Sequence, residues 1–196
     1  MSCCGHCRDA GNFFDQRTAR REMKRYKRRG PEASTQKLID AIAEETVEGL
    51  TLLDVGGGIG AIPFELFNKG LAKAVNVDAS GAYQTAAMKE ATERGLQDRT
   101  AYHFGDAVEL VPHRSPADIV TLDRVICCYP DYQALLESTL PKAKRWYGLV
   151  FPKENGLTKV GVRLVNSWFW LKRSEFRTFI HPTQSVEQII RSHGFE

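Results

Sequence analysis

The sequence predicts an α/β fold with a doubly wound, mostly parallel sheet. Short apolar runs alternate with amphipathic stretches from Thr51 onward, and a glycine-rich turn joins the first run to a helical stretch. Such alternation produces right-handed β-α-β units whose helices cover both faces of a parallel sheet. The chain has 196 residues, 42% of them hydrophobic, which is enough for a single well-packed domain.

The first 48 residues are expected to form a basic helical lid. Residues 13–29 are predicted to form a highly charged helix that the Gly30-Pro31 pair ends, and a second helix is predicted to begin near residues 34–35. The second helix carries one narrow apolar stripe, which is enough to dock it on a larger body but not to fold it alone. The stripe consists of Leu38, Ile39, Ile42 and Ala43.

The segment 49–156 is expected to be the core of the domain. Its predicted strands are 51–55, 74–78, 100–104, 118–123 and 147–152. Its predicted helices are about 62–69, 82–94 and 133–145. Gly70 and Gly95 follow two of these helices as stops, and Pro63 falls in an allowed first turn.

The segment 157–196 is expected to form a helical cap. Residues 157–180 are a long amphipathic stretch rich in aromatic side chains, and a final helix is predicted around 184–193. Trp168, Phe169 and Trp170 fit either a pocket for a flat apolar substrate or ordinary packing of the helix on the core.

Composition and charge exclude several classes of protein. The formal net charge is +3, but residues 1–30 carry nine basic and three acidic residues, so the rest of the chain has a net charge of −3. Positive charge is therefore concentrated in the N-terminal segment and is not spread over the whole protein. An odd number of cysteines, five, favours a reducing compartment. No apolar run approaches the roughly 20 residues that span a bilayer, and no signal peptide is recognisable. We expect a cytoplasmic protein without a membrane partner, and the oligomeric state stays open.

The strongest signal is the glycine loop after residues 51–55. Its glycines let the backbone approach a ligand closely, and the following helix offers unpaired N–H groups. Gly56-x-Gly58-x-x-Ala61, with Asp78 further on, fits a dinucleotide fingerprint. Asp54-x-Gly56-x-Gly58-x-Gly60 is also the first motif of S-adenosylmethionine-dependent methyltransferases. The candidate cofactor-binding residues here are Asp54, Gly56, Gly57, Gly58 and Gly60.

The charge of Asp54 separates these two readings. A carboxylate beside the glycines repels a pyrophosphate, whereas S-adenosylmethionine has an α-ammonium and a sulfonium group against one carboxylate. The sequence therefore favours S-adenosylmethionine as the cofactor. An NAD(P)-dependent oxidoreductase remains the alternative.

The later predicted strands add polar groups at the same edge of the sheet. Asp78, with the adjoining Ala79, ends the second strand, where a carboxylate can bind both ribose hydroxyls. Gly105, Asp106 and Ala107 end the third strand and can contact the adenine. The fourth strand places a further group at this edge. That group is Asp123, Arg124, Cys127, Cys128 and Tyr129.

Over residues 51–152 the chain resembles the class I S-adenosylmethionine-dependent methyltransferases, whose fold is Rossmann-like. Within them it resembles the magnesium-protoporphyrin O-methyltransferase group. That likeness rests on the Tyr129-Pro130 pair, the strand end at 150–153, the basic helix with Tyr26, and Phe179-Ile180-His181.

This sequence departs from the family pattern in two places. Cys128 stands where the tetrapyrrole enzymes have a histidine, which leaves a porphyrin substrate open. The family fold also closes its sheet with two strands after the last helix. We expect this chain to be a shortened form without them, with the strand at 147–152 as an open edge.

The resemblance implies transfer of a methyl group to a small-molecule acceptor through an oxygen atom, either a carboxylate or a hydroxyl. Methyl transfer depends on alignment and desolvation and needs no metal. A carboxylate needs no base, whereas a hydroxyl does. The candidate catalytic residues are Asp123, Tyr129 and His181.

Three further questions stay open at this point. The helix at 13–29 can act as a lid whose Tyr26 and arginines close over the cofactor, as a solvated face, or as an arm that binds nucleic acid. The last role makes an RNA methyltransferase an alternative, although the negative charge of the rest of the chain disfavours nucleic acid. The chain can also bind cofactor as a partner-dependent subunit without turnover. Finally, the cluster Cys3, Cys4, His6 and Cys7 is spaced poorly for zinc and is expected to be a redox-labile or disordered tail.

Overall fold

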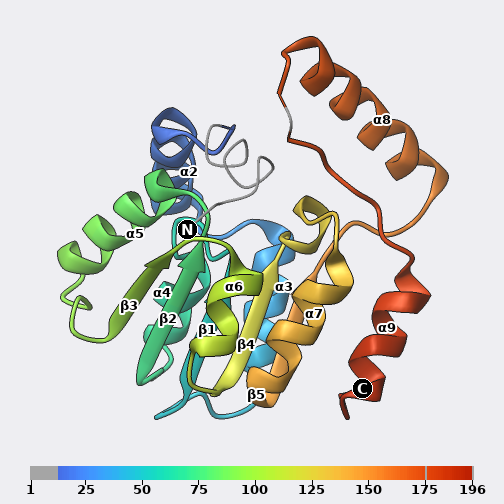
Figure 1. Ribbon diagram of the computed structural model, residues 1–196. Coiled ribbons are helices and arrows are strands. Elements are labelled where there is room, and N and C mark those ends of the chain that lie inside the picture. Colours follow the sequence, from blue (N-terminus) through green and yellow to red (C-terminus); the bar gives the residue numbers. More distant parts are fainter. Residues whose placement is uncertain (1–12, 175, 196) are drawn as a thin grey trace.

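The computed structural model describes residues 13–174 and 176–195 (Figure 1). A five-stranded sheet in the order β3-β2-β1-β4-β5 forms its centre, and every strand pairs in parallel with its neighbours. The predicted α/β class with a parallel, doubly wound sheet is confirmed. The strands are β1 Thr51–Val55, β2 Lys73–Asp78, β3 Thr100–Phe104, β4 Ala117–Asp123 and β5 Ala143–Val150.

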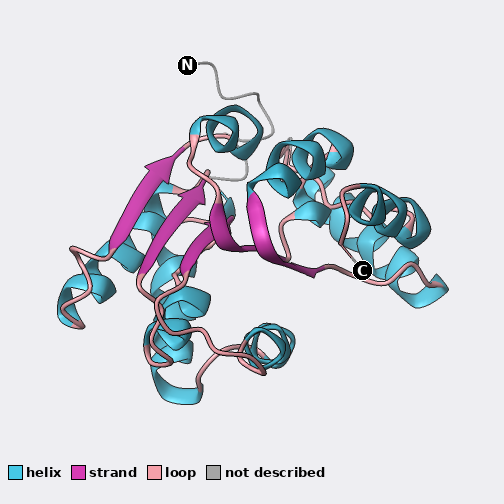
Figure 2. Cartoon of the chain, turned by 90° about the horizontal axis from the view of Figure 1, so that it is seen from below, coloured by secondary structure: helices cyan, strands magenta, loops and turns pink. Residues whose placement is uncertain are grey.

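Helices cover both faces of the sheet, as the view from below shows (Figure 2). Those on the two faces are α3 Ala33–Ile42, α4 Ala61–Phe67, α5 Gly81–Glu93, α6 Ala107–Leu110 and α7 Tyr132–Thr139. Outside them lie α2 Gln16–Arg29, α8 Gly156–Leu171 and α9 Thr183–Ser192. Single 3-10 turns are Val111–His113, Ile126–Cys128 and Leu140–Lys142.

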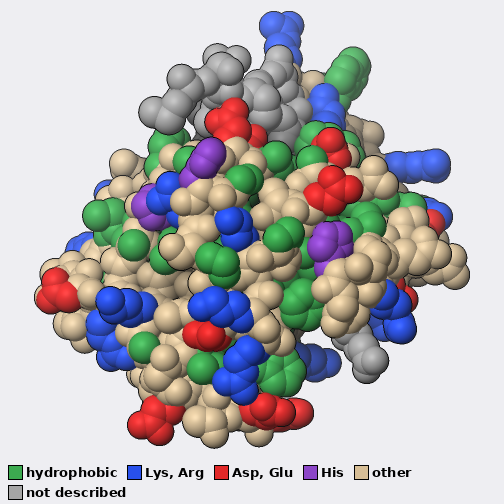
Figure 3. All heavy atoms as spheres, turned by 60° about the horizontal axis from the view of Figure 1, so that its bottom comes forward, with side chains coloured by type: hydrophobic (Ala, Val, Ile, Leu, Met, Phe, Trp, Pro, Cys, Tyr) green, Lys and Arg blue, Asp and Glu red, His purple; other side chains and the backbone are tan. Residues whose placement is uncertain are grey.

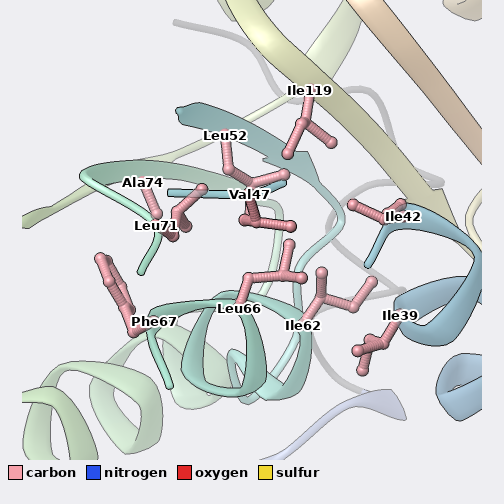
Figure 4. Close-up of a cluster of buried hydrophobic side chains, with 10 residues drawn as sticks. All are labelled: Ile39, Ile42, Val47, Leu52, Ile62, Leu66, Phe67, Leu71, Ala74 and Ile119. Atoms are coloured by element: carbon pink, nitrogen blue, oxygen red, sulfur yellow. The ribbon is translucent and has the colours of Figure 1, made fainter. Parts of the chain in front are cut away.

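The core has a separate apolar cluster on each face of the sheet. On one face, side chains of α3 and α4 meet alternate residues of the strands (Figure 4). On the other face, α6 and α7 cover the intervening positions Leu53, Val55, Val120 and Leu122. Because both faces of β1 and β4 are covered, these strands read as continuous apolar runs.

The order of the strands reverses at β1. The chain runs from β1 outward through β2 to β3, then crosses back to β4 and β5 on the other side. In open sheets of this kind ligands bind beyond the carboxyl ends of the strands, next to the reversal. The site is therefore expected above β1 and β4.

Two predicted boundaries are wrong. The helix predicted to reach residue 145 ends at Thr139, because Pro141 lies in the 3-10 turn that follows, and β5 already begins at Ala143 opposite Ala117. The helical part of 157–180 ends at Leu171, since Arg173 takes a left-handed backbone conformation with φ of 56°. None of the helices in the described ranges has the length and apolar character required to cross a bilayer.

Candidate active site

Two neighbouring cavities open at the carboxyl edge of the sheet. The larger has a volume of about 220 Å³ and lies over β2, β3 and β4, and the smaller, of about 60 Å³, lies over β1 beneath α2 and α3. Both are lined by Gly56, Gly58, Asp123, Arg124 and Glu22 of α2. The two cavities therefore share a wall formed by the glycine loop and the end of β4.

Two positions of the glycine loop, Gly56 and Gly57, lie against their surroundings too closely for any side chain. A Cβ atom on Gly56 would lie 2.3 Å from Cγ2 of Val125, and the φ of Gly56 is 63°. A Cβ atom on Gly57 would lie 2.4 Å from both Oδ2 of Asp54 and Nδ2 of Asn76. These positions accept glycine alone, because contacts below about 3 Å force backbone or buried groups to move.

Asp78 ties the glycine loop to the start of α5. Its Oδ2 accepts a hydrogen bond of 2.8 Å from the amide of Gly58, and its Oδ1 accepts one of 2.7 Å from the amide of Ser80. Burial raises the pKa of Asp78 to about 6, although the hydrogen bonds from these two amides act to lower it. The carboxyl group lines the larger cavity next to Ala79.

Asp54 lies beneath the smaller cavity and is almost fully buried. Its Oδ1 accepts a hydrogen bond of 2.7 Å from the hydroxyl of Thr121, and no described residue donates to its Oδ2. Burial raises the pKa of Asp54 to about 7, and the charges of Asp123 and Asp78 act in the same direction. The group is thus a buried carboxyl group, and its second oxygen has no described donor.

Asp123 and Arg124 form the wall between the cavities. The hydroxyl of Thr35 on α3 donates a hydrogen bond of 2.6 Å to Oδ2 of Asp123. The guanidinium of Arg124 contacts Glu32, which precedes α3, and also Asp123 itself. Arg124 adopts a left-handed conformation with φ of 59°, which is uncommon for a residue with a long side chain. The N-terminal helices are therefore fastened to the end of β4.

The far end of the larger cavity is closed by Tyr129. Its hydroxyl donates a hydrogen bond of 2.6 Å to Oδ1 of Asp106 and accepts one of 3.1 Å from the amide of Ala107. Gly105, Ala107 and Tyr129 line the cavity, whereas Asp106 lies behind them and caps α6 through the amide of Val108. Cys128 also lines this cavity.

Four of the residues that sequence reasoning placed at the site line neither cavity: Tyr26, Gly60, Asp106 and His181. Tyr26 is buried against Phe64, and its hydroxyl donates a hydrogen bond of 2.7 Å to the carboxylate of Glu65. Gly60 faces the ring of Phe64 from the N-cap of α4. Tyr26 was expected to close over the cofactor as part of the lid, but its side chain packs against α4 instead.

His181 is likewise a correction, since it does not face either cavity. It is buried, and its Nε2 lies 2.9 Å from the carbonyl oxygen of Ile126 and 3.0 Å from that of Tyr129. Because both partners are acceptors, Nε2 carries the proton, and burial lowers the pKa of the ring. His181 therefore holds the loop after β4 and is not available there as a base.

Sequence reasoning missed the groups that other elements bring to the cavities. Phe14 and Glu22 reach the larger cavity from the N-terminal segment, and Thr35 reaches the smaller one from α3. Ser80 holds the N-terminal segment at the larger cavity, because its hydroxyl donates a hydrogen bond of 2.7 Å to the carbonyl of Phe14. Only the position of Ser80, just before a predicted helix, gave a signal, namely that of an N-cap.

The described residues contain no group of three or more histidine, cysteine or acidic side chains that could hold a metal ion. The cluster Cys3, Cys4, His6 and Cys7 lies outside the described residues. Cys127 and Cys128 are both in the thiol form, with their sulfur atoms 4.0 Å apart.

Comparison with known proteins points to a methyltransferase. Residues 53–140 match the family described as a methyltransferase domain, and this range includes the glycine loop, Asp78 and the end of β4. This part of the chain is therefore similar to a methyltransferase domain, and the parallel sheet has the class I methyltransferase fold.

Solved structures show the same methyltransferase fold. Magnesium protoporphyrin IX methyltransferase (ChlM) from Synechocystis PCC 6803, with bound SAH, superposes with a TM-score of 0.66 at 20% identity, over 83% of this chain and 74% of that one. The YcgJ protein of Bacillus subtilis gives 0.63 at 19% identity, over 83% and 68%. The [4+2]-cyclase SpnF gives 0.62 at 24% identity, over 82% and 57%. A search of curated protein sequences gives no match.

Two observations show that the smaller cavity suits the methionine end of S-adenosylmethionine. Oδ2 of Asp54 is buried without a described donor, as a partner for a cationic group requires. Nε of Arg25, on α2 at the same smaller cavity, is also buried without a described acceptor, and suits a carboxylate. S-adenosylmethionine carries both an ammonium and a carboxylate at its methionine end.

Proposed function

We propose that this methyltransferase transfers the methyl group of S-adenosylmethionine to a carboxylate oxygen of a small-molecule acceptor. The observation that carries the proposal is the position of His181, which is buried and bound to two carbonyl oxygens. No described histidine lines the larger cavity. An acceptor that is already anionic needs no base.

The two cavities suit the two halves of the cofactor. In this proposal Asp78 binds the ribose hydroxyls in the larger cavity, and Ala79 with Gly105 and Ala107 borders the adenine, with Asp106 supporting Tyr129 from behind. The methionine end occupies the smaller cavity, where Asp54 and Asp123 receive the ammonium. The carboxylate meets the loop amides of Gly56, Gly57 and Gly58 together with Arg25.

The reaction requires alignment more than covalent help from the protein. The positive sulfur of the cofactor activates the methyl carbon toward an in-line displacement. Asp123 and Arg124 fix the wall between the cavities, and Arg124 can attract an anionic acceptor. Tyr129 positions the far side of the cavity through its bonds to Asp106 and Ala107. Phe14 lines the cavity and, with the surrounding wall, helps to exclude water.

We further propose that residues 1–48 act as a lid, 49–156 as the cofactor-binding core and 157–196 as a cap within one domain. Support for the lid comes from Phe14 and Glu22, which line the larger cavity, and from the bond between Ser80 and the carbonyl of Phe14. The likeness to ChlM, a magnesium protoporphyrin IX methyltransferase, is compatible with a carboxylate acceptor.

The test uses S-adenosylmethionine carrying a labelled methyl group and the small-molecule fraction of a bacterial cell extract. We expect label in a small molecule, released as methanol by alkali, because methyl esters hydrolyse under conditions that leave methyl ethers intact. The variant Asp78→Asn should give no label. Label that resists alkali would overturn the carboxylate acceptor, and label in an RNA fraction would overturn the small-molecule acceptor.

A further inference from the structure

Helix α8 carries an apolar stripe that nothing in the described chain covers. Its members lie three or four residues apart and so share one side of the helix. Leu157 is 85% exposed, Trp168 51% and Leu171 72%. We call this the α8 stripe: Leu157, Val160, Leu164, Trp168 and Leu171.

The opposite side of α8 is the one that docks on the protein. Phe169 is buried, in edge-to-face contact with Phe13 and Phe176 at 5.1 and 5.2 Å between ring centroids. Asn166 accepts a hydrogen bond of 2.9 Å from the amide of Thr178 and donates one of 2.8 Å to its carbonyl. The orientation of the helix is therefore fixed, and it directs the α8 stripe away from the core.

The α8 stripe is bordered by positive charge. Between residues 153 and 173 the chain has five basic residues and one acid, Glu154, which pairs with Lys159 at 2.8 Å. The basic residues are Lys153, Lys159, Arg163, Lys172 and Arg173, all exposed. An apolar stripe with tryptophan and basic borders suits the boundary between lipid headgroups and acyl chains.

A second, independent feature lies on α2. Five exposed basic side chains follow the spacing of one helix face, and none of them forms a salt bridge within the described ranges. We call this the α2 basic stripe: Arg17, Arg20, Arg21, Lys24 and Arg28. Arg25 and Lys27 border this stripe on its two sides, and both of them form salt bridges with acidic residues.

Both stripes belong to the same end of the molecule. Figure 1 shows α2 and α8 beyond the carboxyl edge of the sheet, where the cavities open. Phe13, just before α2, stacks on Phe176 after α8 at 5.3 Å, which links the two elements directly. By contrast, the face turned forward in Figure 3, toward the amino edge, has acidic and basic side chains intermixed.

We propose that the α8 stripe and the α2 basic stripe together dock this methyltransferase on an anionic lipid surface. The partner must be apolar where it meets leucine and tryptophan, and negative where it meets the arginines. A nucleic acid lacks the first property, and a second copy of this surface would bring like charges together. The proposal differs from the prediction made from the sequence alone, which was that the protein has no membrane partner.

The test is cosedimentation of the full chain with vesicles of phosphatidylglycerol and phosphatidylethanolamine, compared with neutral phosphatidylcholine vesicles. We expect binding to the anionic vesicles, with a blue shift of tryptophan fluorescence, and little binding to the neutral ones. Each headgroup-facing basic residue contributes about 1 kcal/mol, a factor of about 5. Arg20→Gln with Arg21→Gln should therefore weaken vesicle binding roughly 30-fold.

Matched variants separate the docking surface from general effects of charge. Leu164→Glu should abolish binding, whereas Met88→Glu, at a 51% exposed position on α5, should not change it. Lys69→Gln with Lys73→Gln, at the amino edge of the sheet, is the control for the arginine pair. Trp168→Phe should retain binding, because it keeps an apolar ring.

Several results would overturn the proposal. These are vesicle binding that survives Leu164→Glu, equal binding to neutral vesicles, and loss of binding in the Met88→Glu control to the same extent. Tight RNA binding that depends on the α2 basic stripe and is unaffected by Leu164→Glu would assign that stripe to nucleic acid. A stable dimer that Leu164→Glu dissociates would assign the α8 stripe to a second copy.

Discussion

The hydroxyl of Thr121 donates a hydrogen bond of 2.7 Å to Oδ1 of Asp54, directly across the sheet from it. Both residues are buried, on neighbouring strands at the reversal of strand order. One hydrogen bond holds the carboxyl group in place, and the other oxygen, Oδ2, has no described donor. The same burial raises the pKa of Asp54 to about 7.

Asp54→Asn should change how stability depends on pH. The folded pKa of about 7 lies above the ordinary value of 3.8, so the folded protein holds a proton that the unfolded chain has lost between these values. The contribution of Asp54 to the free energy of unfolding therefore falls as pH rises through this window. From pH 5 to pH 8 the wild type should lose about 2 to 3 kcal/mol relative to Asp54→Asn, measured by urea unfolding without cofactor.

Asp118 provides a control of opposite sign. Its carboxyl group accepts hydrogen bonds from the amide and hydroxyl of Thr51, which lower its pKa. The stability it contributes is present above its ordinary pKa and lost as pH falls. If Asp54→Asn and Asp118→Asn shift the pH dependence in the same direction, the assignment of the buried proton to Asp54 is wrong.

Asp78→Asn should weaken the binding of S-adenosylhomocysteine about 100-fold, because the ribose hydroxyls lose a carboxylate with two acceptor oxygens and the glycine loop loses an anchor. Isothermal titration calorimetry measures the affinity. Asp118→Asn again serves as control, since it removes a carboxylate with two similar bonds far from the cavities. Unchanged affinity in Asp78→Asn would remove Asp78 from the site.

Gly57→Ala should lower stability by about 1 to 3 kcal/mol and weaken cofactor binding, because the new Cβ would meet Asp54 and Asn76 at 2.4 Å. Gly161→Ala is its counterpart in α8, where nothing lies within 4 Å of the added atom. That change should stabilise the protein by up to about 1 kcal/mol through helix propensity. Thermal unfolding with and without S-adenosylhomocysteine compares the two. A Gly57→Ala protein that binds normally would show that the loop relaxes without cost.

His181→Ala should cost about 1 to 3 kcal/mol, because the buried carbonyl groups of Ile126 and Tyr129 lose their donor. His181→Gln keeps an N–H donor and should restore part of this loss together with methyl transfer. Burial lowers the pKa of His181, so the stability that it contributes is lost as pH falls below its ordinary value of 6.5. Activity of His181→Ala that falls with stability unchanged would instead indicate a base.

The sequence was sufficient for those parts of the fold that local patterns determine. The strands at 51–55 and 100–104 match the prediction to the residue, because each is a short run with clear turns on both sides. The start of β5 was missed, because Lys144 and Arg145 at its exposed end carry no apolar pattern. There the pairing with β4 determines the strand.

The residues of the candidate site also fall into those that local sequence patterns predict and those that depend on packing. Asp54, the glycine loop and Asp78 were predictable because each follows directly from a strand end. Thr35 and Glu22 were not, since their positions depend on how α3 and α2 pack over the sheet. Tyr26 shows the limit, because its side chain turns toward Phe64 and only the packed structure reveals this.

The segment between α8 and α9 is attached to the loop that walls the larger cavity. The amide of Phe179 donates a hydrogen bond of 2.7 Å to the carbonyl of Cys127, and Nε2 of His181 binds the carbonyl oxygens of Ile126 and Tyr129. Asn166 joins the same segment to α8. These hydrogen bonds connect α8 in series with the loop that lines the larger cavity. We therefore expect a change in the tilt of α8 to displace the backbone at Cys128 and Tyr129.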